Sequence, residues 1–110
     1  MSRDGRYSEA QPVIANATEL LDGRAVVPVA GTAVPLSEVS IGCQRVDIQA
    51  MKNNSGTIVI GGPTVVAEEA NRTGIALEAG EGYALSIADL QDVFIDATTD
   101  GEGVTFIYQE

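Results

Sequence analysis

The clearest pattern in the chain is the alternation of apolar and polar residues over positions 45–50. This segment reads Arg-Val-Asp-Ile-Gln-Ala, so every second side chain is apolar. A period of two is typical of a β-strand with one buried face and one solvated face. The segment therefore predicts a strand whose Val46, Ile48 and Ala50 side chains face a core.

Similar short patterns recur along the rest of the chain and are separated by glycine-rich or asparagine-rich turns. The further candidate strands cover residues 25–29, 36–41, 57–60, 64–67, 75–77, 83–88, 93–97 and 104–108. Short strands at a spacing of about 8–12 residues are typical of sandwiches and jelly rolls. The sequence thus predicts an all-β, seven- to eight-stranded antiparallel sandwich, jelly-roll-like, over residues 25–110.

Three local features refine this prediction. Residues 53–56, Asn-Asn-Ser-Gly, form a turn sequence, which favours a hairpin between strands 45–51 and 57–60. The inward parity switches between Ile41 and Val46, which indicates a bulge or strand break near residues 42–44. Residues 25–29 contain Pro28 and are expected at a sheet edge, since proline cannot donate to a ladder.

In strand 83–88 we expect Tyr83, Leu85 and Ile87 to face the core. In the last two strands the expected inward side chains are Val93, Ile95 and Ala97, followed by Val104, Phe106 and Tyr108. The polar stretch 68–73 is expected to be a loop with room for one helical turn.

Residues 1–24 are polar and weakly patterned, and they predict an extended N-terminal arm with a short helical turn over 18–21. A floppy terminus is one interpretation. The other is an arm that becomes ordered on a partner, and four large aliphatic side chains favour it because a free tail seldom carries them. These four are Val13, Ile14, Leu20 and Leu21.

The net charge of −10 changes the picture of possible partners. Binding of nucleic acid through a basic face is not expected, because phosphate affinity comes mainly from lysine and arginine. Residues 56–110 contain Arg72 as their single basic side chain against ten carboxylates. This density of acid either serves solubility or marks the end of a particle component that faces solvent while the other end contacts a partner.

The composition also excludes several classes of protein. No apolar run approaches the ~18 residues of a membrane span, and the first residues lead into no apolar signal segment. Without histidine and with one cysteine, the chain lacks the usual zinc ligands, an internal disulfide and histidine-based catalysis. We therefore expect no enzyme, no cofactor and no metal of the usual type.

Some side chains still suggest chemistry. Asp96, Asp100 and Glu102 cluster near a glycine-containing turn and offer oxygen ligands for Ca²⁺, although solvated acids at turns are common. Cys43 lies beside the parity break, where a buried small hydrophobic residue is the first interpretation and a reactive thiol the second.

Glu78 and Glu81 flank another turn and formally resemble a glycosidase carboxylate pair. The chain has no tryptophan and few aromatic residues to provide a platform for sugar, which argues against that activity. The acidic stretches 78–82 and 100–103 are expected to point outward.

Four segments, in order, resemble small β-sandwich proteins that are encoded among the virion genes of tailed phages. They read CQRVDIQA (43–50), NSGTIVIG (54–61), GIALEAGE (74–81), and DL with VFIDA and GVTFIY between residues 89 and 108. The resemblance covers about residues 36–108 and is one of strands and turns. It implies a role in capsid decoration (cement), as a head fibre or as a tail component, and it implies no catalytic residue set.

We therefore expect a non-enzymatic virion structural protein, first of all a capsid decoration protein that binds the major capsid protein. The alternative is a phage tail or fibre module, or another ligand-binding β-sandwich. A homo-oligomer is expected, with a trimer favoured, because decoration proteins usually sit at symmetry axes. The expected location is the virion, after synthesis in the host cytoplasm.

The expected partner contacts lie in the arm and on two later strands. The strand phase places Phe94 and Ile107 opposite the inward face, so at least one should be covered by another subunit or by the arm. The full set is Arg3, Arg6, Tyr7, Val13, Ile14, Phe94 and Ile107.

Overall fold

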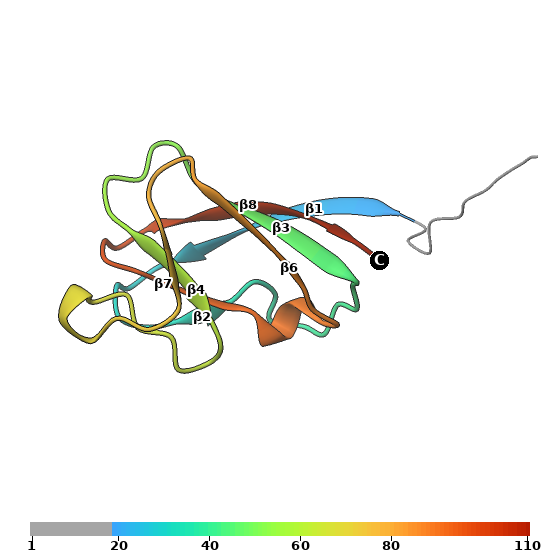
Figure 1. The fold of residues 1–110 in the computed structure, drawn as a ribbon, viewed down its shortest axis with the longest axis horizontal. Coiled ribbons are helices and arrows are strands. Elements are labelled where there is room, and N and C mark those ends of the chain that lie inside the picture. Colours follow the sequence, from blue (N-terminus) through green and yellow to red (C-terminus); the bar gives the residue numbers. More distant parts are fainter. Residues whose placement is uncertain (1–18) are drawn as a thin grey trace, which may run out of the picture.

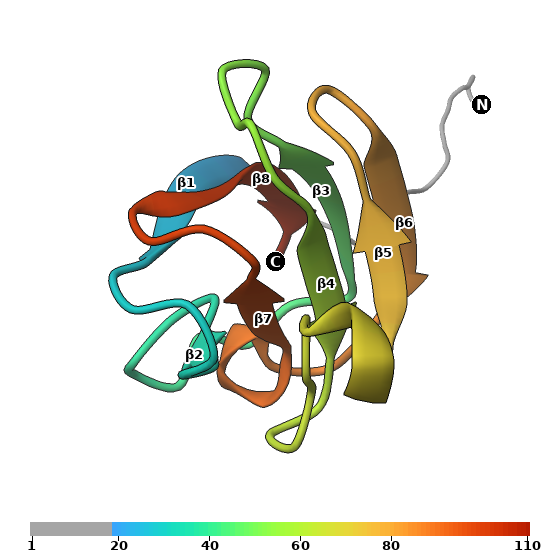
Figure 2. The same ribbon diagram turned by 90° about the vertical axis from the view of Figure 1, so that its left-hand side faces the viewer.

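The computed structural model describes residues 19–110, which form eight β-strands in two four-stranded sheets (Figures 1 and 2). The first sheet has the order β1-β8-β3-β6 and the second the order β2-β7-β4-β5, and all pairings are antiparallel. The strands are β1 (Leu20–Val27), β2 (Val34–Pro35), β3 (Arg45–Ala50), β4 (Ile58–Gly61), β5 (Ile75–Leu77), β6 (Gly82–Ser86), β7 (Phe94–Ala97) and β8 (Glu102–Gln109). Single 3-10 turns cover Glu69–Asn71 and Leu90–Asp92.

The strand pairings are nested, which identifies the sandwich as a jelly roll. β1 pairs with β8, β2 with β7, β3 with β6 and β4 with β5. This is the order of one long hairpin rolled around a core, and it closes through the pairs β3–β8 and β4–β7. The predicted all-β antiparallel sandwich of jelly-roll type is confirmed.

The core lies between the two sheets and is built from the residues that alternation predicted. Val46, Ile48 and Ala50 are buried, and so are the inward side chains of β7 and β8. The Phe106 ring packs over Gly23 of β1, where even a methyl group would lie 2.6 Å from its Cζ atom. Glycine at position 23 therefore leaves room for the aromatic ring of Phe106 in the core.

Several local predictions are wrong. Segments 36–41 and 64–67 are not strands, although Leu36, Val65 and Ala67 are buried. The predicted hairpin does not form either, because β3 and β4 belong to different sheets and the turn at 53–56 carries the chain between them. Of the two alternatives predicted near residues 42–44, a bulge or a strand break, the structure has the strand break. Gly42 forms an isolated bridge to Asp89 before β3 begins.

The boundary of the predicted arm is also wrong, because β1 starts at Leu20 and pairs with β8 over its whole length. Leu20 and Leu21 are therefore strand residues, not part of a helical turn, and residues 20–24 belong to the sandwich. β1 does lie at a sheet edge, as predicted for segment 25–29. In β6, Leu85 packs against the core, whereas Tyr83 is 43% exposed because its strand is the other edge of that sheet.

Candidate functional site

The outer face of the β2-β7-β4-β5 sheet is covered by the chain's own loops. Val59 and Asp96 are register partners, so they share one face of the sheet. They alternate with core residues of β4 and β7 and therefore point away from the core between the sheets, yet they are 0% and 1% exposed. Val65 and Ala67, from the segment that follows β4, pack with Val59 in a second apolar cluster. Figure 2 shows this segment curling beside β4. We call this surface the covered face.

Asp96 holds two loops onto the covered face. Its Oδ1 accepts a hydrogen bond from the backbone N–H of Gly31 at 3.0 Å, and its Oδ2 accepts one from Ala67 at 2.9 Å. Oδ1 also accepts from the N–H of Ala97 at 2.9 Å. A buried carboxylate needs such partners, and here they tie residues 28–31 and 62–67 to β7.

The outer face of the β1-β8-β3-β6 sheet has no such cover from the described residues. Its outward side chains form three rungs that run across all four strands. The rungs are Leu20, Gln109, Arg45 and Ser86; then Asp22, Ile107, Asp47 and Ala84; then Arg24, Thr105, Gln49 and Gly82. All of these residues except half-buried Asp47 are exposed. We call this surface the open face.

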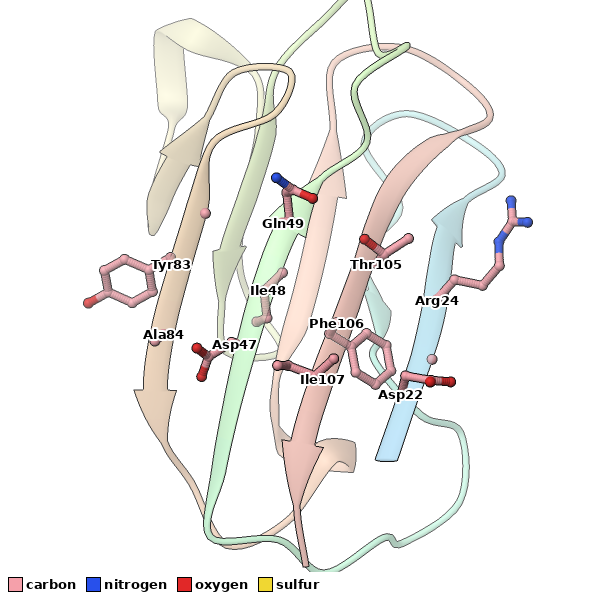
Figure 3. A pocket seen from close by; sticks show the side chains of 12 residues that line it. Asp22, Arg24, Asp47, Ile48, Gln49, Tyr83, Ala84, Thr105, Phe106 and Ile107 are labelled. Carbon is pink, nitrogen blue, oxygen red and sulfur yellow. The ribbon is translucent and has the colours of Figure 1, made fainter. Parts of the chain in front are cut away.

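A groove of about 840 Å³ runs across the open face, between the second and third rungs (Figure 3). Its floor is the backbone of Gly23, Phe106, Ile48 and Tyr83, whose neighbours in sequence form the walls. Three strand spacings give the groove a length of about 14 Å, and its walls start about 7 Å apart at the backbone. This volume lies within the range of ligand pockets.

The walls of the groove differ in charge. One wall carries Asp22 and Asp47, with Ile107 between them, while the other carries Arg24, Thr105 and Gln49. Asp47 accepts a hydrogen bond from Nε of Arg45 at 2.9 Å, and both side chains are about half exposed. An exposed pair of this kind contributes little stability, so both groups remain available to a ligand. Toward β6 the walls end in Ala84 and Gly82, which leaves the groove open there.

The three carboxylates considered as candidate calcium ligands accept hydrogen bonds from backbone amides. Asp96 is buried as described, and Asp100 accepts from the N–H of Ala30 at 2.7 Å. Glu102 accepts from the N–H groups of Ser55 and Gly56 at 2.7 and 2.9 Å and from the Ser55 hydroxyl. Within residues 19–110, no group of three or more acidic, histidine or cysteine side chains is arranged to hold a metal ion.

These bonds also affect the acidity of Glu102. The hydrogen bond from the Ser55 N–H, followed by those from Gly56 and the Ser55 hydroxyl, holds the pKa of Glu102 below its ordinary value. The carboxylate thus fastens the turn at 53–56, which carries the chain between the sheets, to the start of β8.

The carboxylates of Glu78 and Glu81 both accept hydrogen bonds from groups of the chain itself. Glu78 accepts from the Thr57 hydroxyl at 2.9 Å, and Glu81 accepts from the N–H of Glu78 at 2.8 Å. Both side chains are exposed, as expected for an outward-pointing turn.

Cys43 is half-buried and packs against the core. Its thiol donates to the carbonyl of Ile87 at 3.2 Å. Burial, together with the charge of Asp89, raises the pKa of the Cys43 thiol. Its surroundings therefore favour the small hydrophobic role over the reactive one.

The predicted partner residues fall in different places. Ile107 lies 45% exposed at the centre of the open face. Phe94 is half-buried against the second apolar cluster, so the chain's own loop covers it and no other subunit is needed to do so. Arg3, Arg6, Tyr7, Val13 and Ile14 lie outside the described residues. The groove residues Asp22, Arg24 and Tyr83 were missed, although the outward Asp47 and Gln49 of the clearest strand pointed to this face.

Comparisons of the chain with protein families, with curated proteins and with solved structures find no match. Among residues 19–110, no helix has the length and apolar character that crossing a bilayer requires.

Proposed function

We propose that this protein is a non-enzymatic virion structural protein, a capsid decoration protein that binds the major capsid protein through its open face. The observation that carries the proposal is the contrast between the two outer faces. Within residues 19–110, the chain covers one face with its own loops and leaves the other as a grooved surface with Ile107 at its centre. An apolar centre with a charged and polar rim is the usual anatomy of a protein interface.

The fold is compatible with this role and does not select it. Jelly rolls form viral capsid domains, but they also form lectins and cupins, so the choice rests on the site and on the resemblance to phage virion proteins. A role in binding, not catalysis, is further supported by the acidic side chains that were considered as candidate ligands, because they have structural partners. Those at 96, 100 and 102 hold backbone amides in place, and the chain has no histidine.

In this role the protein is made in the host cytoplasm and becomes part of the virion. The acidic turn at 100–103 lies at the surface and faces solvent in the assembled particle. The N-terminal residues Arg3, Arg6 and Tyr7 add contacts to the coat, and the protein assembles as a trimer at symmetry axes of the shell.

The test is co-sedimentation of the purified protein with preassembled coat shells. Ile107→Asp places a charge at the centre of the open face and is expected to abolish binding while the protein stays folded. The matched control is Val39→Asp, because Val39 is 65% exposed but lies in the loop before β3, away from the open face. Equal binding by the two variants would contradict the proposal.

The second candidate is a tail, fibre or other ligand-binding module, and the polar walls of the groove favour it. Carboxylate, amide, hydroxyl and guanidinium groups facing one another across about 7 Å offer hydrogen bonds to a polyhydroxylated ligand. Electron microscopy of particles with and without the protein separates the two roles. Density over the whole shell supports decoration, whereas density at a single vertex, or binding on a glycan array, supports the second candidate.

A further inference from the structure

The two edges of the open sheet differ in how they are protected from pairing with another strand. β1 and β6 are these edges, and within the described residues each pairs with a single neighbour. β1 carries Asp22 and Arg24, and charged side chains discourage edge-to-edge pairing. β6 reads Gly-Tyr-Ala-Leu-Ser, with no charge and no proline. The β6 edge therefore lacks the usual features that keep another strand away.

The register shows which backbone groups of β6 are free. The N–H of Ala50 donates to the carbonyl of Glu81 at 2.9 Å, which sets the phase of the ladder. Residues 83 and 85 therefore direct their amides and carbonyls toward β3. The residues that alternate with them, Gly82, Ala84 and Ser86, direct theirs away from the sheet. All three are exposed and have small side chains, which leaves room for another strand to approach.

We infer that residues 10–18 of one copy of the chain add as a strand to this free edge of β6 in a neighbouring copy. This segment reads Ala-Gln-Pro-Val-Ile-Ala-Asn-Ala-Thr and has no charged residue in a chain of net charge −10. An uncharged segment meets no repulsion at an uncharged edge. Backbone hydrogen bonds give such strand addition its affinity, and Val13 and Ile14 supply apolar contact beside Tyr83.

The position of residue 19 favours a neighbouring copy over the same chain. The N–H of Glu110 donates to the carbonyl of Glu19 at 3.3 Å, so the chain still runs beside β8 at that point. β6 lies at the opposite edge of the sheet, about 14 Å away across β8 and β3. To reach its own β6, the segment has to cross the end of the sheet and reverse its direction. A head-to-tail exchange avoids this reversal and closes into a ring, such as the proposed trimer.

The acceptor edge is tested with Ala84→Pro in the full chain. The lost N–H is one that faces away from β3, so the ladder of the sheet keeps its hydrogen bonds and the protein is expected to fold. We expect the mass in light scattering to fall from about three times 11.4 kDa to 11.4 kDa. Ala84→Lys is a second acceptor variant, and Thr105→Lys is its control, with the same charge on the same face but away from the edge.

The donor segment is tested with the double variant Val13→Asp, Ile14→Asp, which is also expected to be monomeric. Its control is Ser2→Asp, Ser8→Asp, which adds the same charge outside the uncharged run and is expected to remain oligomeric. The decisive experiment mixes the acceptor variant with the donor variant. The acceptor variant keeps an intact donor segment, and the donor variant keeps an intact β6 edge. The two should therefore form a one-to-one heterodimer that adds no further copies.

No coat protein takes part in these measurements, so their failure is distinct from failure of the proposed function. A monomeric full chain at all concentrations would overturn the inference. So would oligomers that survive Ala84→Pro in a folded protein, or a mixture of folded variants that stays monomeric.

Discussion

The two outer faces of this jelly roll consist of similar antiparallel strands, but one face is buried and the other is exposed to solvent. On the covered face, the outward side chains Val59 and Asp96 are almost inaccessible to solvent. On the open face, the outward Ile107 is 45% exposed. The difference lies in the loops, because residues 28–31 and 62–67 fold back over β4 and β7, while no described loop folds over β8 and β3.

This contrast shows that the alternation of a strand does not by itself decide which face is buried. An outward residue becomes a core residue when a loop is fastened over it, and here Asp96 provides the fastening. Among residues 19–110, the face without such a cover is the one whose outward side chains stay exposed.

The largest expected effect is a difference in unfolding free energy between substitutions at two adjacent positions of β8. One side chain faces the core and the other lies on the open face. Phe106 is 7% exposed and its ring packs over Gly23, so Phe106→Ala is expected to cost about 3–5 kcal/mol in urea melts. Ile107→Ala, at a half-exposed position, is expected to cost under about 1 kcal/mol. Similar costs for the two variants would show that Ile107 is buried, which would contradict the exposure of the open face.

The next effect concerns the covered face. Asp96→Ala leaves the partly buried N–H of Gly31 and the buried N–H of Ala67 without their acceptor and is expected to cost about 2–5 kcal/mol. Asp100→Ala removes one exposed hydrogen bond, to Ala30, and serves as the control, with an expected cost under about 1 kcal/mol. Hydrogen exchange at residues 62–67 should rise in the first variant alone. Unchanged exchange there would mean that Asp96 does not hold the loop.

A smaller effect is expected on acidification, through two carboxylates that fasten connections around both sheets. Hydrogen bonds from the Ser40 hydroxyl and from the N–H groups of Gln91 and Ile41 lower the pKa of Asp89, as Ser55 and Gly56 lower that of Glu102. A lowered folded-state pKa stabilises the fold above the ordinary values of 3.8 and 4.5. This contribution is lost as the pH falls through the folded-state values.

Thermal melts between pH 6 and pH 2 measure this loss. The double variant Asp89→Asn, Glu102→Gln is expected to show a flatter decline below about pH 4.5, the upper of the two ordinary values. A decline as steep as that of the unmodified protein would assign acid sensitivity to other groups.

The smallest effect is expected at the groove wall. Asp47→Asn breaks the ion pair with Arg45, whose two members are about half exposed, and is expected to change stability by under about 0.5 kcal/mol. A cost above about 2 kcal/mol would show that the groove wall is part of the structural framework rather than a free surface.

Much of the fold follows from alternation, because a half-buried strand has a period that the sequence displays. The inward sides of β3, β7 and β8 were predicted residue by residue for this reason. The hairpin prediction failed because the turn at 53–56 has the same local chemistry whether it returns to the same sheet or crosses to the other. That choice depends on pairings with β6, β7 and β8, which lie far along the chain.

The open face could be predicted only in part. Ile107 was placed correctly, since its parity opposes that of Phe106 and Tyr108. The same reasoning placed Phe94 at the surface and missed its cover, because that depends on where residues 62–67 fold. Burial of Asp96 was likewise not visible, since a carboxylate that accepts backbone N–H groups looks in sequence like any acid at a turn.

The position of β8 has a consequence for how the protein is made. β8 is the last of the eight strands to leave the ribosome, and it lies between β1 and β3 in the interior of its sheet. Until residues 102–109 emerge, β1 lacks β8, the strand with which it pairs in the described structure. The groove then also lacks the residues that β8 contributes to it. The nascent chain must therefore keep its apolar strands apart from other chains during synthesis, and slow closure by distant pairings is expected to set the pace of folding.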